Sequence, residues 1–322
     1  MCGIVGFTGL DNAVSVVVDG LKRLEYRGYD SAGVAVISET GLRILRRVGR
    51  VSELEAAIAA APQPHATCAI GHTRWATHGK PSERNSHPHT DPLGLVAVVH
   101  NGIIENYQQL KVELTQAGNV FSSDTDTEVI AHLVAMSLEK VQKDAPDTPR
   151  AEALLAAVEL AIARLDGSFA IGVVAASCPN CIVAAKQSSP LVIARTDFAA
   201  ILASDVAPLV AFTKEVIFLE DGQTALLTPG HLRVRSAGRD IEPAITTVEW
   251  DVEAAERAGF PHFMLKEIFE QPVTLHRLAA ELINDPGSNG DDASLEPSFN
   301  LAGPVLATDS LQAVSRVVLV AQ

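Results

Sequence analysis

Cys2, the second residue of the chain, can supply both a nucleophile and a base. Its small side chain permits removal of Met1, after which Cys2 carries a thiol beside a free α-amine. An α-amine titrates near ~7.7–8.0 and a thiol near ~8.5, so the amine is a competent general base at neutral pH. Gly3 leaves room for the backbone to approach a substrate. Taken alone, however, the Met-Cys dipeptide fits an accidental cysteine better than a catalytic one.

Asn101 and Gly102 offer two hydrogen-bond donors that could stabilise a developing negative charge. A side-chain amide and an adjacent backbone N–H can converge on one oxygen, and loss of one such donor typically costs about 2.7–4 kcal/mol of barrier. The same Asn-Gly pair is also the commonest signal for a type I′ hairpin turn. Considered without the motifs around it, the Asn-Gly pair favours a type I′ turn over an oxyanion-binding role.

Seven motifs occur in order along the chain, and together they resemble one enzyme family. They are MCGIVG, LEYRGYDSAG, GHTRWATHG, HPH, VVHNGIIENY, SDTDTEVIAHL and HFMLKEIFEQP. This set resembles the class II glutamine amidotransferases, whose glutaminase domain is an N-terminal-nucleophile hydrolase, and within them the members that aminate fructose 6-phosphate. The resemblance covers residues 2 to about 272. CGIVG alone would indicate only the wider superfamily, whereas seven ordered motifs are specific.

The resemblance implies that the chain uses L-glutamine through a covalent mechanism. Cys2 is expected to attack the glutamine side-chain amide, with Asn101 and Gly102 holding the oxyanion. Ammonia then leaves, and water releases glutamate from a thioester. In the family, the ammonia reaches a sugar-isomerase domain, which converts fructose 6-phosphate to glucosamine 6-phosphate.

Four further residues match family positions that bind glutamine. Arg74 is expected to hold the α-carboxylate, because a guanidinium can bind a carboxylate bidentately, and Asp126 is expected to hold the ammonium. Thr77 and His78 follow Arg74 and match additional glutamine-binding positions. From their spacing alone, Thr77 and His78 fit a polar loop with solvated side chains equally well.

Two other matched residues are expected to act around the site. Trp75 matches a family residue that gates the ammonia route, although a tryptophan considered alone more often packs in a core or lid. Arg27 matches a supporting position, and an ion pair with Asp30 or another carboxylate is the alternative. The chain departs from the family pattern where Phe269 replaces a common histidine and Ala194 a usual glycine.

The order of elements predicts an α+β fold. Strands are bunched with helices and do not alternate regularly as in parallel doubly wound domains. The expected strands are 2–8, 33–37, 42–48, 68–72, 95–100, 169–176, 182–185, 191–194, 201–203, 207–213, 223–228 and 315–320. The expected helices are 12–24, 51–61, 104–117, 125–141, 148–165, 253–269, 274–283 and a short one at 309–314. The resemblance implies a four-layer αββα sandwich of two mainly antiparallel sheets, followed by a helical linker.

The resemblance also divides the chain into three parts. Residues 2–240 are expected to form the glutaminase domain, and 241–303 a helical linker with a flexible loop. Residues 304–322 resemble the start of a sugar-isomerase domain that is truncated here. We expect the full-length protein to be a homodimer.

Two cysteine and histidine motifs are interpreted as structural. His87-Pro88-His89 lacks a third metal ligand at recognisable spacing, which favours a structural loop. Cys178 and Cys181 form a single CxxC without a partner CxxC, at a place where a hairpin turn is expected. We therefore expect no metal and no cofactor.

Composition excludes several classes of protein. The 322 residues carry a formal net charge of -14, which disfavours binding to nucleic acid or to an anionic membrane. No apolar run reaches the ~18 residues that span a bilayer, and the N-terminus does not resemble a signal peptide. Four cysteines are too few for a disulfide scaffold, so we expect a cytoplasmic globular protein.

Two rival functions remain to be weighed. A different class II amidotransferase, such as the phosphoribosyl transferase of the purine pathway, is disfavoured by FMLKEIFEQP and the linker after it. A non-catalytic module that retains only the fold is disfavoured because Cys2, Asn101 and Asp126 are all present. Retention of Met1 would support the non-catalytic module, because an acylated nitrogen is not a base.

Overall fold

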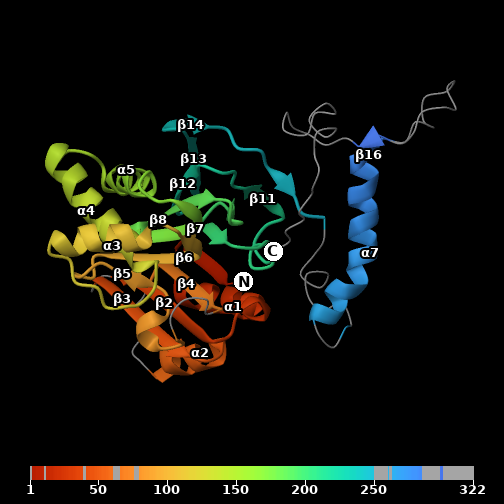
Figure 1. The fold of residues 1–322 in the computed structure, drawn as a ribbon, viewed down its shortest axis with the longest axis horizontal. Coiled ribbons are helices and arrows are strands. Elements are labelled where there is room, and N and C mark those ends of the chain that lie inside the picture. The colour runs from red at the N-terminus through yellow and green to blue at the C-terminus, as the bar shows by residue number, and fades with distance from the viewer. Residues whose placement is uncertain are drawn as a thin grey trace, which may run out of the picture. The chain divides into compact units, whose positions relative to one another are not determined.

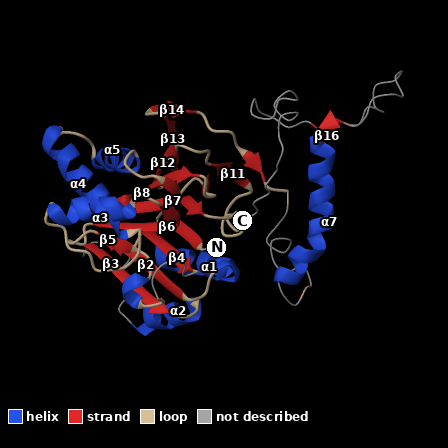
Figure 2. Ribbon diagram, in the orientation of Figure 1, coloured by secondary structure: helices blue, strands red, loops and turns tan. Residues whose placement is uncertain are grey.

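Apolar strands in the first part of the chain pair into two antiparallel sheets (Figures 1 and 2). They are seen in a computed structural model, which describes residues 2–10, 12–38, 41–60, 66–75, 80–249, 260, 263–284 and 298–299. The chain divides into two compact units, Met1–Ala255 and Glu256–Gln322. Both large sheets belong to the first unit.

The first sheet has eight strands, with the N-terminal strand in its interior. Its order is β15 (Thr246–Thr247), β11 (Glu215–Phe218), β9 (Val192–Arg195), β10 (Ala200–Ala203), β1 (Gly3–Thr8), β4 (Cys68–Arg74), β2 (Ser31–Ser38) and β3 (Gly41–Val48). β1 pairs antiparallel with β4, with Gly3 opposite Thr73. This register brings the beginning of β1, and so Cys2, to the end of β4.

The second sheet has seven strands and carries the Asn-Gly pair. Its order is β14 (Arg239–Ile241), β13 (His231–Ser236), β12 (Gln223–Thr228), β8 (Cys178–Gln187), β7 (Gly167–Ala175), β6 (Val96–Ile104) and β5 (His89–Thr90). β6 and β7 pair antiparallel from Val96 opposite Ala175 to Ile104 opposite Gly167.

Three apolar clusters show that the sheets are stacked between helices. The inner cluster joins side chains of both sheets, such as Ile4 and Ile70 with Val99 and Ile182. A second cluster joins the eight-stranded sheet to α1 (Ala13–Leu24) and α2 (Val51–Ala60). A third joins the seven-stranded sheet to α3 (Tyr107–Gln116), α4 (Glu128–Asp144) and α5 (Arg150–Ile162). The predicted α+β class and the four-layer αββα order are confirmed, and Figure 2 shows the two helix groups on opposite sides of the strands.

The apolar spacing explains why these segments take their places. In α1, Val17, Val18, Leu21 and Leu24 recur at helical spacing and are buried, as the sequence predicted. In β1, all six residues are buried because one face meets α1 and the other meets the facing sheet. A strand buried on both faces has no polar alternation, which is why it appears in the sequence as a continuous apolar run.

Several predicted elements are wrong in type or in extent. The helix expected at 104–117 begins only at Tyr107, because Ile104 still pairs with Gly167 in the sheet. The strand expected at 207–213 is a series of turns, in which the N–H groups of Leu209 and Val210 both donate to the Val206 carbonyl. Leu209 and Val210 are buried in the cluster that joins the eight-stranded sheet to α1, so an apolar run with buried side chains imitated a strand.

The CxxC segment is part of a strand and is not the predicted turn. Cys178 begins β8 and pairs with Ala175, so the turn of this hairpin lies at 176–177. The register of this hairpin shifts between Val173 and Ala175, and Cys178 and Cys181 are both buried.

In the second unit, considered by itself, the described residues 263–282 form one continuous helix across the point where a break between two helices was predicted. The start of the first predicted helix, at 253–259, lies outside the described residues. α7 (Phe263–Leu282) runs through Pro272, and Ile283 lies in the short strand β16 (Ile283–Asn284), which pairs with β17 (Ser298–Phe299). Most of the predicted loop at 284–303, the helix at 309–314 and the strand at 315–320 lie outside the described residues. In the described part of the chain, no helix is long and apolar enough to cross a bilayer.

The inner cluster predicts a strong dependence of stability on Ile70. Ile70→Ala removes a fully buried side chain between the two sheets. We expect it to lower the free energy of unfolding by about 2–5 kcal/mol in urea denaturation. Val112→Ala, at a position that is 58% exposed in α3, is the control and should change it by less than about 0.5 kcal/mol. Equal effects of the two substitutions would contradict a core between the sheets.

Candidate active site

Cys2 lies just before β1, where the end of β4 passes beside it. The Trp75 N–H donates to Cys2 Sγ at 3.2 Å, and the Trp75 carbonyl oxygen lies 3.6 Å from the same sulfur. Burial raises the pKa of the Cys2 thiol, while the hydrogen bond from Trp75 and the charge of Arg74 oppose this rise. The thiol is therefore protonated at neutral pH, and a base must remove its proton before the sulfur can attack. Met1 lies outside the described residues.

The Asn101 side chain connects Cys2 to the facing sheet. Its Nδ2 donates to the Cys2 carbonyl oxygen at 3.0 Å, and its Oδ1 lies 3.0 Å from His72 Nε2. An amide nitrogen carries two hydrogens, so the bond to Cys2 uses one of them and leaves the second for another acceptor. A nucleophile and an amide donor are thus side by side.

Gly102 occupies a position that only glycine can fill. Its φ of +127° is a conformation that other residues rarely adopt, and an added Cβ would lie 2.0 Å from the Ser168 carbonyl oxygen. Asn101 and Gly102 pair with Ala170 and Phe169 inside the β6–β7 ladder. The type I′ turn, which the pair alone favoured, is therefore wrong for this chain.

The two predicted head-group residues are both buried near strand ends. Arg74 ends β4 and is 4% exposed, and its positive charge acts on the Cys2 thiol. Asp126, 8% exposed, precedes α4, and its Oδ2 accepts a hydrogen bond from the Ile104 N–H at 2.8 Å. The end of β6 thus holds this carboxylate two residues beyond Gly102.

Trp75 and Arg27 lie at the edge of this group. The Trp75 ring is half exposed and meets Tyr29 edge to face, with the ring centroids 6.0 Å apart. Arg27 forms a short ion pair with Asp205, while its Nε donates to the Tyr26 hydroxyl at 3.1 Å. The carboxylate partner shown for Arg27 is thus Asp205. Thr77 and His78 lie outside the described residues.

A cluster of buried histidines lies beside Asn101, and nothing in the sequence pattern predicted that these histidines adjoin the site. The His72 and His87 rings stack with centroids 4.1 Å apart, and His89 meets His87 at 4.8 Å. His100, the residue before Asn101, donates its backbone N–H to His87 Nδ1 at 3.3 Å. Only the alternation of β4, which places His72 and Arg74 on one face, could have indicated this cluster.

Burial keeps these imidazoles neutral. It lowers the pKa of His72 and of His89 to about 3, and that of His87 and His100 below the usual value. Neighbouring positive charge adds to the effect, since Arg74 lowers the pKa of His72 and His87 further. The cluster therefore offers neutral hydrogen-bonding groups at physiological pH.

The two histidines of the HPH segment contact the residues on either side of Asp126. His89 Nε2 lies 3.1 Å from the Thr125 hydroxyl, and His87 Nε2 lies 3.5 Å from the Thr127 hydroxyl. These two threonines flank Asp126. The HPH segment therefore connects β5 to the residues around Asp126. This agrees with the structural role that the sequence favoured.

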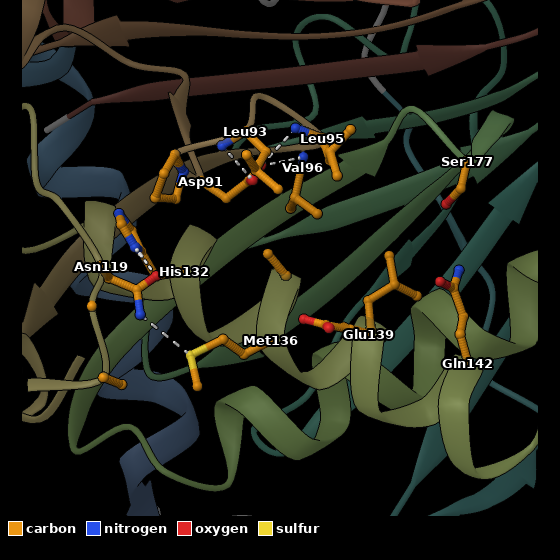
Figure 3. A pocket seen from close by; sticks show the side chains of 15 residues that line it. Asp91, Leu93, Leu95, Val96, Asn119, His132, Met136, Glu139, Gln142 and Ser177 are labelled. Atoms are coloured by element: carbon orange, nitrogen blue, oxygen red, sulfur yellow. Dashed lines mark hydrogen bonds between the residues drawn. The ribbon is translucent and has the colours of Figure 1, made fainter. Parts of the chain in front are cut away.

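A separate pocket lies on the α4 side of the seven-stranded sheet (Figure 3). Its volume is about 470 Å³, and Leu93, Asn119, His132, Met136 and Glu139 are among its lining residues. None of the predicted site residues lines it. Figure 3 shows His132 beside Asn119, where His132 Nδ1 lies 3.0 Å from Asn119 Oδ1.

Comparison with known proteins defines the class to which this arrangement belongs. Residues 72–211 match the family model described as a Glutamine amidotransferase domain. The match supports a glutamine amidotransferase domain over residues 72–211, and the two stacked sheets between helices form the αββα sandwich that the sequence predicted.

Within this class, the sequence is similar to the glutamine–fructose-6-phosphate aminotransferases (isomerizing). It is 48% identical over 276 residues to the protein of that name from Symbiobacterium thermophilum, covering 85% of this chain and 43% of that protein. It is 42% identical over 325 residues to the one from Methanosarcina acetivorans, covering 100% of this chain and 50% of that protein. The chain thus spans about half the length of the curated relatives that it matches.

A solved structure supports the fold. The glutamine phosphoribosylpyrophosphate amidotransferase from B. subtilis, complexed with ADP and GMP, matches with a TM-score of 0.58 at 23% identity. The match covers 73% of this chain and 49% of that chain. At this identity the likeness establishes the common fold alone.

The buried histidines predict that acid destabilises the protein. In the unfolded chain a histidine titrates near ~6.5, whereas burial holds His72 and His89 neutral down to about pH 3. Below ~6.5 the unfolded state therefore binds protons that the folded state does not, and stability falls by up to ~1.4 kcal/mol per pH unit for each such group. Urea denaturation at pH 7, 6 and 5 should show this loss. His89→Gln should show a shallower dependence on pH, and an unchanged free energy of unfolding from pH 7 to 5 would contradict the assignment.

Proposed function

We propose that this chain hydrolyses L-glutamine to glutamate and ammonia through a thioester on Cys2. The observation that carries the proposal is the contact between Cys2 and Asn101, whose Nδ2 donates to the Cys2 carbonyl oxygen at 3.0 Å. A nucleophilic thiol and a donor for an oxyanion lie together at a strand beginning that becomes the N-terminus once Met1 is removed. The glutamine amidotransferase domain at 72–211 supports glutamine as the substrate.

In the first step, the α-amine of Cys2 takes the thiol proton. The sulfur then forms a bond to the side-chain amide carbon of glutamine, and the carbonyl oxygen becomes an oxyanion. The second hydrogen of Asn101 Nδ2 and the Gly102 N–H stabilise that oxygen. The Trp75 N–H, 3.2 Å from Sγ, stabilises the sulfur while it is negatively charged.

In the second step, the carbon–nitrogen bond of the amide breaks. The protonated α-amine donates its proton to the departing nitrogen, which leaves as ammonia, and a γ-glutamyl thioester remains on Cys2. The amine, neutral again, takes a proton from water, whose oxygen attacks the thioester. The bond to sulfur breaks, glutamate leaves, and the proton returns to the thiol.

The head group of glutamine is recognised by opposite charges. Arg74 binds the α-carboxylate and Asp126 the α-ammonium, each from a buried position near Cys2 or Asn101. Thr77 and His78 add further contacts to glutamine, and Trp75 gates the departure of ammonia. Arg27 supports the site through its ion pair with Asp205, on the turn that follows β10.

The names of the relatives suggest the acceptor of the ammonia. We propose that residues 2–240 are the glutaminase domain, 241–303 a helical linker and 304–322 the start of a sugar-isomerase domain. In the longer, homodimeric protein, that domain would convert fructose 6-phosphate to glucosamine 6-phosphate. This chain alone should release ammonia from glutamine and form no glucosamine 6-phosphate.

The role of the thiol is tested by substitution. Cys2→Ala should abolish glutamate release, measured with purified chain and L-glutamine, because no other group forms the thioester. Cys68→Ala is the matched control, since burial raises the pKa of the Cys68 thiol to about 12 and so keeps it unreactive. Undiminished glutamate release by a folded Cys2→Ala variant would refute the proposal.

The role of the α-amine is tested without changing a side chain. A chain with one extra residue before Cys2 keeps the thiol but converts its amine to an amide, which is not a base. We expect a loss of about 10²–10⁴-fold in kcat/KM for glutamine. In the chain that begins at Cys2, kcat/KM should rise with pH until the amine is deprotonated, and a flat profile between pH 6 and 8 would argue against this base.

A further inference from the structure

The geometry points to His72 as a positioning residue that holds the Asn101 amide in the orientation needed to donate to an oxyanion. This inference rests on the proposed function of Cys2 and Asn101, and it adds a residue that the sequence motifs did not single out. His72 acts through Asn101: its described hydrogen-bond contacts are with Asn101 and with His100, and not with Cys2 Sγ.

An asparagine is useful as an oxyanion donor in only one of two orientations. Rotation of its amide by half a turn exchanges Oδ1 and Nδ2, and it would then present an acceptor to the oxyanion. In this chain the Cys2 carbonyl oxygen lies 3.0 Å from one end of the amide and His72 Nε2 lies 3.0 Å from the other. The two contacts together can select one orientation.

The His100 carbonyl oxygen determines which ring nitrogen of His72 carries the hydrogen. His72 Nε2 lies 3.0 Å from that oxygen, which can only accept, so Nε2 must bear the proton. The same N–H then faces Asn101 Oδ1 as a shared donor. Because the two backbone carbonyls cannot exchange donor for acceptor, they impose the orientation of the amide between them.

The surroundings keep His72 a neutral donor. Burial is the main cause that lowers its pKa to about 3, and the positive charge of Arg74 acts in the same direction. The His87 ring stacks on its face at 4.1 Å and 12°, which restrains the plane of the imidazole. The donor is thus fixed in direction and is unaffected by pH in the range where glutamine hydrolysis is measured.

Strand β4 explains why this arrangement is built into the fold. His72 lies opposite Ile4 in the ladder with β1, and Arg74 follows two residues later on the same face. Asn101 comes from β6 in the other sheet. One strand therefore places the residue that orients the donor and the residue that we propose binds the glutamine carboxylate.

The test separates positioning from general support of the fold. His72→Phe keeps a ring against His87 and removes the N–H, and we expect kcat for glutamine hydrolysis to fall by about 10–100-fold, somewhat less than for loss of the donor itself. KM should change by less than about 2-fold, because the head-group residues are untouched. His72→Gln restores an N–H near the position of Nε2 and should recover kcat to within about 3-fold of the original chain.

A double-mutant cycle gives the decisive comparison. Asn101→Ala removes the donor, so adding His72→Phe to it should lower kcat by less than about 2-fold further. His132→Phe is the matched control, because His132 is equally buried, its Nδ1 lies 3.0 Å from Asn119 Oδ1, and the pocket that it lines includes none of the proposed site residues (Figure 3). His132→Phe should keep kcat within about 2-fold of the original chain, even if it lowers the thermal midpoint of unfolding as much as His72→Phe does.

The outcomes distinguish the two claims. If Asn101→Ala hydrolyses glutamine at the full rate, the proposed function of Asn101 fails. If Asn101→Ala is impaired but His72→Phe has full kcat, or its effect adds fully to that of Asn101→Ala, the inference about His72 alone is overturned. If His72→Phe does not fold, the same cycle is run with His72→Leu, and His72→Gln must then exceed it in kcat.

Discussion

The proposed site depends on a hydrogen bond that links the two sheets, from Asn101 Nδ2 to the Cys2 carbonyl oxygen. Cys2 immediately precedes an interior strand of one sheet, and Asn101 lies in the second half of a strand in the other, 99 residues away. Everything that sets the distance between the sheets therefore also sets the distance between nucleophile and donor. The apolar cluster of Ile4, Ile70, Val99 and Ile182 keeps that spacing, since close-packed interiors resist compression and expansion.

The polar groups around this bond are buried, and burial determines their chemistry. Removing the thiol from water raises the pKa of Cys2 and makes a base necessary, while removing His72 from water lowers its pKa and keeps it a neutral donor. The same low-dielectric surroundings strengthen fixed hydrogen bonds to a developing charge. Burial thus explains both why the Cys2 thiol needs a base and why His72 stays a neutral donor to Asn101.

Much of the fold followed from local pattern, and the failures have physical reasons. The amphipathic spacing of Val17, Leu21 and Leu24 identified α1, because a helix with one buried face has a distinctive period. The segment at 207–213 was wrongly predicted as a strand, because a run of apolar residues does not show whether a strand or a series of turns buries them. The motifs brought Cys2, Asn101 and Arg74 to notice, but His72 escaped notice because its partners lie 28 and 29 residues away, in the other sheet.

The central claim is that Cys2 becomes acylated during glutamine hydrolysis, and mass spectrometry of the intact chain tests it most directly. A sample quenched in acid during turnover should contain chain heavier by one γ-glutamyl group, and peptide mapping should place that group on Cys2. The adduct should be absent when glutamate replaces glutamine at the same concentration. Steady release of glutamate with no adduct on Cys2, or with an adduct on another cysteine, would contradict the account.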